Sequence, residues 1–135
     1  MAALTAGRKT PQRIAEEFGR DLAADAVIHS GAMVALNAAG YAVPAAANAA
    51  FKTDGHAEES VSNLGGANGA KKVLVRKSTY RFANSAGGDL ITRADLLTNC
   101  FVVDDQTVAK TSNANARPVA GFIVDVDAVG VWVRF

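Results

Sequence analysis

Few side chains in this chain of 135 residues are suited to catalysis or metal binding. There are two histidines, His29 and His56, and one cysteine, Cys100. His56 and Glu58 have the H-x-E spacing of zinc deaminases, but that chemistry also needs a P-C-x-x-C segment, which a single cysteine cannot supply. His29 ends a short β-branched run, so we expect a surface or hydrogen-bonded histidine there. The histidines and the cysteine give no metal-ligand spacing.

The carboxylates form only one pair that suggests chemistry. Asp125 and Asp127 are two residues apart on an expected strand, so they share a face and could bind a cation. We favour a solvent-facing strand end that runs into a turn, while Asp104 and Asp105 are adjacent turn residues that point apart. There is no Gly-x-Ser-x-Gly elbow for a nucleophilic serine. The sequence therefore predicts a protein that is not an enzyme and uses no metal or cofactor.

A glycine-rich stretch, Asn63–Ala70, superficially resembles a phosphate-binding loop. A P-loop needs G-x-x-x-x-G-K-S/T between a strand and a helix. Here the spacing is absent, and a strand is expected to follow. We interpret the stretch as an ordinary loop.

The longest expected strand, Val73–Phe82, lies in the most basic part of the chain. Its apolar positions change parity around Lys77-Ser78, which predicts a β-bulge or a bend. Binding of nucleic acid would favour aromatic side chains on the same face as the cations, whereas Tyr80 and Phe82 suit a core better. We favour a solvated face or a protein contact, with nucleic-acid binding as the alternative. The cations are Lys71, Lys72, Arg76, Lys77 and Arg81.

The clearest structural element is a hairpin within Gly121–Phe135. Two alternating apolar runs flank Asp127-Ala128-Val129-Gly130, and a period of two is typical of half-buried strands. Asp in the first position and Gly in the fourth suit a type I turn closed by a residue with positive φ. The residues expected on the buried side are Phe122, Val124 and Val126 in the first run, and Val131, Val133 and Phe135 in the second.

Similar punctuation predicts further hairpins. Met33–Leu36 and Tyr41–Val43 flank Asn37–Gly40, and Cys100–Val103 precedes a third turn that leads to Val108–Lys110. A Thr92-x-x-Asp95 capping box predicts one short helix near residues 92–98. Short strands, frequent turns and little helix indicate an all-β domain, either a compact barrel or a sandwich of antiparallel hairpins.

The N-terminal region, residues 1–25, is expected to be an arm, extended or partly helical, ahead of a β-barrel domain at 26–135. Met1–Arg13 has no periodicity and is either a disordered tail or an arm that orders on a partner. Ile14–Ala24 could form a short helix, because Ile14, Phe18 and Leu22 recur every four residues. Gly19 weakens that helix by about 1 kcal/mol relative to alanine.

Composition limits the partners. The net charge is +1, so no global field attracts nucleic acid or anionic membranes. No apolar run approaches the ~18 residues of a membrane span, and no secretion signal is expected. Aromatic residues make up only 7% of the chain, which predicts a thin core helped by assembly. One cysteine excludes an internal disulfide, and its apolar neighbours favour a buried, inert thiol in a reducing cytoplasm.

Several stretches together resemble the small head-decoration (capsid cement) proteins of Mu-like and other tailed phages and prophages. The resemblance covers about Gly31 to Phe135, and the N-terminal Thr10-Pro11 segment also agrees with it. Residues 14–25 depart from the family's pattern. The stretches that carry the resemblance are Gly31–Pro44, Tyr80–Ser85, Ile91–Asp95, Cys100–Ala109 and Ala120–Val133.

The resemblance implies a compact β-barrel or β-tulip fold and a structural role. It implies homotrimers on the outer surface of the capsid of a virion, made in the host cytoplasm, that clamp the major capsid protein and stabilise the expanded head. It also implies an N-terminal arm on the shell, with Arg8, Lys9, Thr10, Pro11 and Arg13 as the expected contact residues. The alternatives are a nucleic-acid-binding barrel that uses strand 71–81, and a tail or baseplate component.

Overall fold

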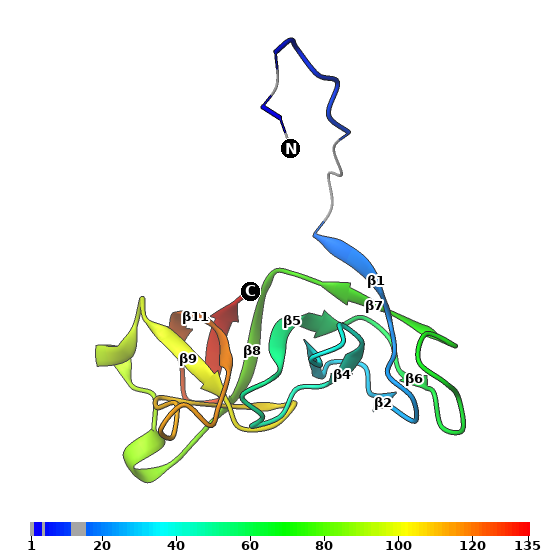
Figure 1. Ribbon diagram of the computed structural model, residues 1–135. Helices are drawn as coiled ribbons and strands as arrows, with labels where there is room; N and C mark the ends of the chain where they lie inside the picture. Colours follow the sequence, from blue (N-terminus) through cyan, green and yellow to red (C-terminus); the bar gives the residue numbers. More distant parts are fainter. Residues whose placement is uncertain (1, 4, 12–15) are drawn as a thin grey trace.

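The computed structural model describes residues 2–3, 5–11 and 16–135 and is all-β, as the sequence predicts (Figure 1). Two single turns of 3-10 helix, η1 and η2, are the only helical elements in these described ranges. The strands are β1 (Glu17–Asp21), β2 (Val27–Ile28), β3 (Met33–Leu36), β4 (Ala42–Pro44), β5 (Lys52–Ala57), β6 (Val61–Ser62), β7 (Lys72–Arg76), β8 (Thr79–Asn84), β9 (Asn99–Val102), β10 (Thr107–Ala109), β11 (Val119–Val126) and β12 (Val131–Arg134), with η1 at Gly87–Asp89 and η2 at Arg93–Asp95.

The first half of the molecule is a five-stranded antiparallel sheet in the order β1-β7-β5-β3-β4. An isolated parallel bridge between Leu22 and Ala42 brings the end of β1 back to β4. The Ala23 N–H donates to the Ala42 carbonyl at 3.0 Å. The sheet therefore curls almost into a barrel but is closed at one point only. The pair β2-β6 lies beside it.

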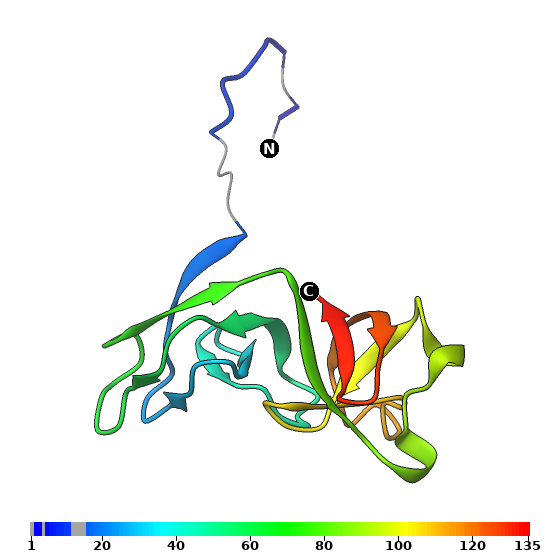
Figure 2. The ribbon, with the colours of Figure 1, turned by 180° about the vertical axis from the view of Figure 1, so that it is seen from behind.

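The second half is a closed barrel in the order β10-β8-β12-β11-β9, with β8 and β10 parallel. Figures 1 and 2 show the two halves side by side, joined by the run from β7 into β8. A closed barrel leaves no strand edge exposed. The barrel therefore has no free strand edge, whereas β1 and β4 remain the edges of the first sheet and meet at a single bridge.

Strand β3 is the wall between two hydrophobic cores. Met33 and Ala35 pack in the core of the barrel, while Val34 packs in the core of the first sheet, and all three are fully buried. Successive side chains of a strand point to opposite faces, so a strand with a core on each face must be apolar at every position. This explains the unbroken apolar run at residues 32–36.

The C-terminal hairpin is confirmed, but its buried face and its glycine need correction. Ile123 is the fully buried residue, and a register shift between Ile123 and Asp125 places a bulge at Val124. The predicted burial of Phe122 and Val124 is therefore wrong, because a bulge reverses the alternation. Val126 beyond the bulge does pack against the barrel core, and the second predicted set, Val131, Val133 and Phe135, is confirmed. Gly130 does not have the expected positive φ. It is required because a Cβ there would lie 2.3 Å from the Phe82 carbonyl oxygen.

The other two hairpins form as predicted. Gly40 closes the first with a φ of +88°, and the Asn37 Oδ1 accepts hydrogen bonds from the N–H groups of Ala39 and Tyr41, both at 3.0 Å. β9 and β10 form the second hairpin, in which the Asp104 Oδ1 accepts from the Gln106 N–H at 2.9 Å. Asx side chains that bond their own turn explain why these turns can be read from sequence.

The expected strand Val73–Phe82 is two strands, interrupted at Lys77-Ser78. β7 belongs to the first sheet and buries Val73 and Val75, whereas β8 belongs to the barrel and buries Phe82. The change of parity marks the passage of the chain from one core to the other. The expected bend is confirmed at the expected place.

The N-terminal prediction needs the largest correction. No helix covers the described part of residues 14–24; Glu17–Asp21 forms β1, paired with β7 over its whole length. The backbone bonds to β7 outweigh a helical spacing already weakened by Gly19. The boundary expected at residues 25 and 26 is consequently too late, because β1 is part of the folded sheet.

The helix expected near residues 92–98 is a single 3-10 turn, Arg93–Asp95. Its capping box is present: the Thr92 N–H donates to the Asp95 carboxylate at 2.8 Å, and the Thr92 side chain accepts from the Ala94 N–H. Leu97, with a φ of 66°, reverses the chain after this turn.

Candidate functional site

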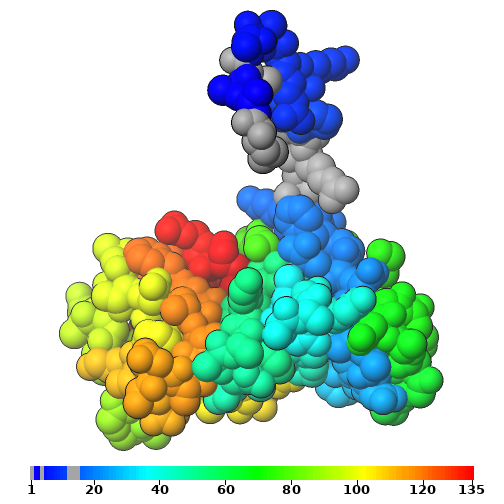
Figure 3. Space-filling model, in the orientation of Figure 1, coloured from blue at the N-terminus to red at the C-terminus, as the bar shows by residue number. Residues whose placement is uncertain are grey.

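The expected contact residues lie on an exposed N-terminal stretch. Arg8, Lys9, Thr10 and Pro11 are all exposed, and Arg13 lies outside the described residues. Figures 1 and 3 show residues 5–11 apart from the compact body. No hydrogen bond or ion pair joins them to the described part of the body. The stretch is therefore free to meet a partner.

Strand β1 connects this stretch to the body and is held by a charged clasp, which we define as Arg20, Asp54 and Lys77. Arg20 on β1 donates from Nε and from a terminal nitrogen to the two Asp54 oxygens, at 2.6 and 2.9 Å. The Lys77 Nζ lies 3.2 Å from the same carboxylate. Because β7 runs between β1 and β5, these side chains tie three segments together.

Asp54 is the charged residue most deeply buried in the described structure, with 4% of its surface exposed. Burial alone would raise the pKa of its carboxyl, but the hydrogen bonds and charges of Arg20 and Lys77 outweigh burial and hold the pKa below its usual value. Asp54 is therefore ionised and fully paired at neutral pH. A bidentate arginine–carboxylate pair also fixes the orientation of β1.

A second polar cluster lies where the two halves meet. Glu58 Oε1 is contacted by the His56 Nδ1 at 3.3 Å and by the Tyr80 hydroxyl at 3.2 Å. The rings of His56 and Tyr80 are stacked, with centroids 3.9 Å apart. Arg76 pairs with Glu17 on β1 and approaches Glu58 at 3.9 Å. This cluster gives β1 a second attachment.

The polar groups of this cluster are engaged with one another. Burial, followed by the hydrogen bond to Glu58, raises the pKa of Tyr80 to about 12, so its hydroxyl remains a protonated donor at neutral pH. His56 is occupied by its stacking on Tyr80 and its contact with Glu58. The deaminase-like spacing of His56 and Glu58 thus serves to join β5 to β8.

The two carboxylates that were expected to share a strand face, Asp125 and Asp127, both accept hydrogen bonds within the molecule. Asp127 accepts from the N–H groups of Val129 and Gly130 and from the Trp132 Nε1, the last at 2.9 Å. The Trp132 hydrogen bond is the main cause that lowers the pKa of Asp127. Asp125 accepts from the Val126 N–H. The favoured interpretation, a strand end running into a turn, is consistent with these bonds.

His29 and Cys100 also have the environments predicted for them. His29 is exposed. Cys100 is fully buried, and burial raises its thiol pKa to about 12, which keeps it protonated and inert. In the described ranges no group of three or more potential ligands is placed to hold a metal ion.

The cations of the basic stretch are largely used within the molecule. Lys72 pairs with Asp21 at 2.7 Å, and Arg81 lies 3.9 Å from Asp127 with its guanidinium over the Trp132 ring. Arg76 and Lys77 belong to the clusters described above. These four cations therefore each have an acidic partner within the described part of the chain.

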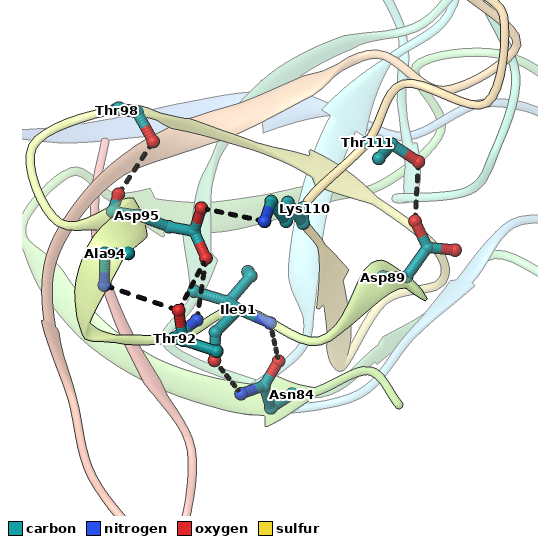
Figure 4. Close-up of polar contacts among 9 residues, drawn as sticks. All are labelled: Asn84, Asp89, Ile91, Thr92, Ala94, Asp95, Thr98, Lys110 and Thr111. Carbon is teal, nitrogen blue, oxygen red and sulfur yellow. Dashed lines mark hydrogen bonds and ion pairs between the residues drawn. The ribbon is translucent and has the colours of Figure 1, made fainter. Parts of the chain in front are cut away.

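An excursion, residues 85–98, lies at the opposite side of the molecule from β1 (Figure 1), and Figure 4 shows its polar contacts. We call it the 85–98 loop. The Asn84 amide bonds both the N–H and the carbonyl of Ile91, at 3.0 and 2.8 Å, and Ile91 is buried. The loop is fixed from its base to its end by such contacts.

Sequence reasoning missed both the charged clasp and the order of the 85–98 loop. Asp54 stands between Lys52-Thr53 and Gly55, a polar stretch that suggests a turn and carries no sign of burial. Arg20 lies in the segment 14–24 that could form a short helix, and the helical spacing gives no indication of its partner. A pairing 34 residues apart leaves no local pattern. The only sign in the sequence that a buried carboxylate needed a partner was the excess of cations between Lys71 and Arg81.

No family model, no curated protein and no solved structure matches this chain. The described residues contain no helix long and apolar enough to cross a membrane.

Proposed function

We propose that this chain is a structural phage protein that decorates the outer surface of a capsid and stabilises the expanded head, which is the role that its resemblance to head-decoration proteins implies. The observation that carries the proposal is the exposed basic stretch, including Arg8 and Lys9, joined to a strand that is clamped to the body. A firmly held β1 transmits to the compact domain any contact that the arm makes. The partners would be the major capsid protein and two further copies in a homotrimer.

The mechanism that we propose is selective binding. A protein that binds the expanded shell, and not its precursor, stabilises the expanded state by mass action. Many copies on one shell, and three arms on each trimer, add their contributions by multivalency. The arm would gain backbone hydrogen bonds by adding a strand to a sheet edge of the shell, while Arg8, Lys9 and Arg13 would pair with acidic groups.

The test is co-sedimentation with expanded empty shells. Three proteins are compared with the full chain: a deletion of residues 1–13; a full-length variant with Arg8, Lys9 and Arg13 replaced by serine; and Lys52→Ser, which removes an exposed cation elsewhere. We expect the deletion to lose most shell occupancy, the triple variant to lose part of it in a salt-dependent manner, and Lys52→Ser to behave like the full chain. Equal occupancy of the deletion and the full chain contradicts the proposed arm.

A second candidate function, a nucleic-acid-binding barrel, is favoured by one observation. On the outside of the barrel, the guanidinium of Arg81 lies over Trp132 and that of Arg134 over Phe122, at 5.6 and 5.0 Å from the ring centroids. Interleaved aromatic and cationic side chains are typical of surfaces that bind single strands. These aromatic residues come from β11 and β12, and not from the basic strand itself.

Retention on a DNA column distinguishes the two functions. A nucleic-acid binder is retained at low salt, elutes as salt rises, and loses retention in Trp132→Ala. A decoration protein passes through such a column and sediments with shells. A tail or baseplate component would do neither and would sediment with tail structures instead.

A further inference from the structure

The polar side chains of the 85–98 loop bind both its own backbone and the segment that follows β10 (Figure 4). The Asp95 carboxylate accepts from the Thr92 N–H and lies 3.4 Å from the Lys110 Nζ, and the Thr98 hydroxyl donates to the Asp95 carbonyl at 2.7 Å. Asp89 accepts from the Thr111 hydroxyl and pairs with Arg117 at 3.1 Å.

These contacts leave one charge of the loop unused. Both loop carboxylates, Asp89 and Asp95, are neutralised by cations from the segment between β10 and β11. Arg93, the loop's cation, is exposed and has no ion pair among the described residues. Among the described residues, Arg93 is therefore the one charged side chain of the loop that has no ion pair.

The loop also presents an apolar side chain at the cost of backbone strain. Leu97 is 67% exposed, and its φ of 66° lies in the left-handed region that a leucine rarely adopts. Its N–H is held by the Ile123 carbonyl at 2.9 Å. Folding alone favours glycine in such a place. The left-handed backbone, rather than the exposure alone, is what singles out Leu97 as a contact residue.

A pocket lies at the other end of β9. This pocket of about 340 Å³, open to solvent, lies between the β2–β3 link and the β9–β10 turn. Hydrogen bonds from the Met33 N–H to the Asp105 carbonyl, at 2.7 Å, and from the Ala83 N–H to the Gln106 carbonyl, at 2.8 Å, fix its walls. The Asp105 carboxylate has no ion pair among the described residues. The lining residues are His29, Ser30, Gly31, Ala32, Asp105 and Gln106.

No residue of the loop lines the pocket of its own chain. Leu97 precedes β9 and Asp105 follows it, so the strand itself, Asn99–Val102, separates them. The Leu97 N–H is bonded to the Ile123 carbonyl, whereas the pocket walls are bonded to Met33 and Ala83. In this conformation a contact between loop and pocket therefore joins two copies.

We propose that the 85–98 loop of one copy docks in this pocket of a second copy, with Leu97 in the pocket and Arg93 paired with Asp105. The opposite charges of Arg93 and Asp105, neither of which has an ion pair among the described residues, argue for a copy of this chain as the occupant. The contact is head-to-tail, and such contacts build closed rings when the rotation closes. This inference rests on the homotrimer of the proposed function and assigns its interface.

The experiment measures the mass of the full chain in solution by light scattering, without shells. Arg93→Glu and Asp105→Arg are each expected to weaken assembly at least tenfold, and the double variant with both changes is expected to restore it. Lys52→Glu, an exposed charge reversal outside both surfaces, is the matched control. A monomeric native chain at the highest concentration, or single variants that assemble normally, overturns the inference. So does a double variant that folds but fails to recover.

Leu97→Gly separates a binding role from a structural role. Glycine relieves the left-handed strain, so this variant should melt at a higher temperature than the native chain while its assembly weakens. Normal assembly of a stabilised Leu97→Gly protein contradicts the proposed contact. If the Arg93 and Asp105 variants assemble normally but fail to sediment with shells, the loop contacts the shell instead. Charge-swap rescue without any shell binding supports this interface and contradicts the proposed function.

Discussion

The two halves of the molecule are closed by different forces. In the barrel every strand has two hydrogen-bonded neighbours, so the backbone itself completes the ring. In the first sheet, β1 and β4 meet only at the Leu22–Ala42 bridge. The charged clasp, Arg20, Asp54 and Lys77, instead fixes β1 to the interior of the sheet, because its side chains reach across β7 to β5.

The cores differ in the same direction. The barrel buries large side chains such as Met33, Phe82 and Ile123, and Phe135 packs against them. The core of the first sheet is smaller and includes three alanines among its eight buried residues. A half with less apolar burial depends more on specific polar contacts. We therefore expect acid to loosen the first sheet before the barrel, beginning at β1, the strand that carries the arm.

The largest expected effects come from the wall strand β3. Met33→Ala empties part of the barrel core and should cost about 3 kcal/mol, while Val34→Ala in the other core should cost about 2 kcal/mol. Chemical unfolding gives the totals, and native-state hydrogen exchange gives the location. We expect faster exchange in β9–β12 for the first variant and in β1, β5 and β7 for the second. Identical exchange patterns mean that the halves unfold as one unit.

Breaking the charged clasp comes next. Arg20→Met leaves Asp54 buried with Lys77 as its remaining partner, so we expect a loss of about 2 kcal/mol, below the 3–5 kcal/mol typical of an abandoned buried charge. Adding Asp54→Leu removes that charge and should recover much of the loss. The unfolding free energies of the two single variants and the double variant measure this coupling. Additive losses mean that the pair contributes little beyond packing.

Acid should act through Asp54. Its pKa is lowered in the folded state, so the unfolded chain binds a proton more readily. The stabilisation is present above the unfolded pKa of about 3.9 and is lost as the pH falls through the lower folded pKa. Asp54→Asn should therefore flatten the dependence of stability on pH below about pH 4, measured by urea unfolding. An unchanged slope shows that other carboxylates dominate acid unfolding.

How far the sequence predicts the fold depends on where each signal lies. The turns at Asn37 and Asp127 were predictable because an Asx side chain bonds the backbone of its own turn. The bend at Lys77-Ser78 was predictable from parity, although its cause, a second core, was not. Periodicity fails where both faces are buried, as in β3, or where a bulge reverses the alternation, as at Val124.

Contacts between distant segments could not be predicted for the candidate site. The exposed Arg8 and Lys9 stand out in the sequence because they are charged and lack periodicity. The attachment of β1 depends on Arg20 and Asp54, which only the folded sheet brings together. A helix at residues 14–24 was a reasonable local expectation, and it is wrong because a neighbouring strand, β7, offers backbone partners along the whole of β1.

A smaller effect is expected at the turn that follows β3. Asn37→Ala removes the side-chain oxygen that accepts from the Ala39 and Tyr41 N–H groups. These groups can then bond water, so we expect a loss of about 1 kcal/mol. Thermal unfolding checks the size of the loss. Asn37→Asp keeps an acceptor oxygen and should retain most of the stability, whereas equal losses in both variants attribute the effect to the amide group.

The smallest effect is expected from removal of the arm. Residues 5–11 are exposed and have no hydrogen bond or ion pair with the described body, so deletion of residues 1–13 should change stability by less than about 0.5 kcal/mol. A deletion of residues 1–21 also removes β1 and exposes the edge of β7. It leaves Asp54 without Arg20, so it should be far less stable. Urea unfolding of the two truncations thus places the start of the folded first sheet. If the shorter deletion is equally damaging, the arm contributes to the fold, and its loss from shells could not be assigned to binding alone.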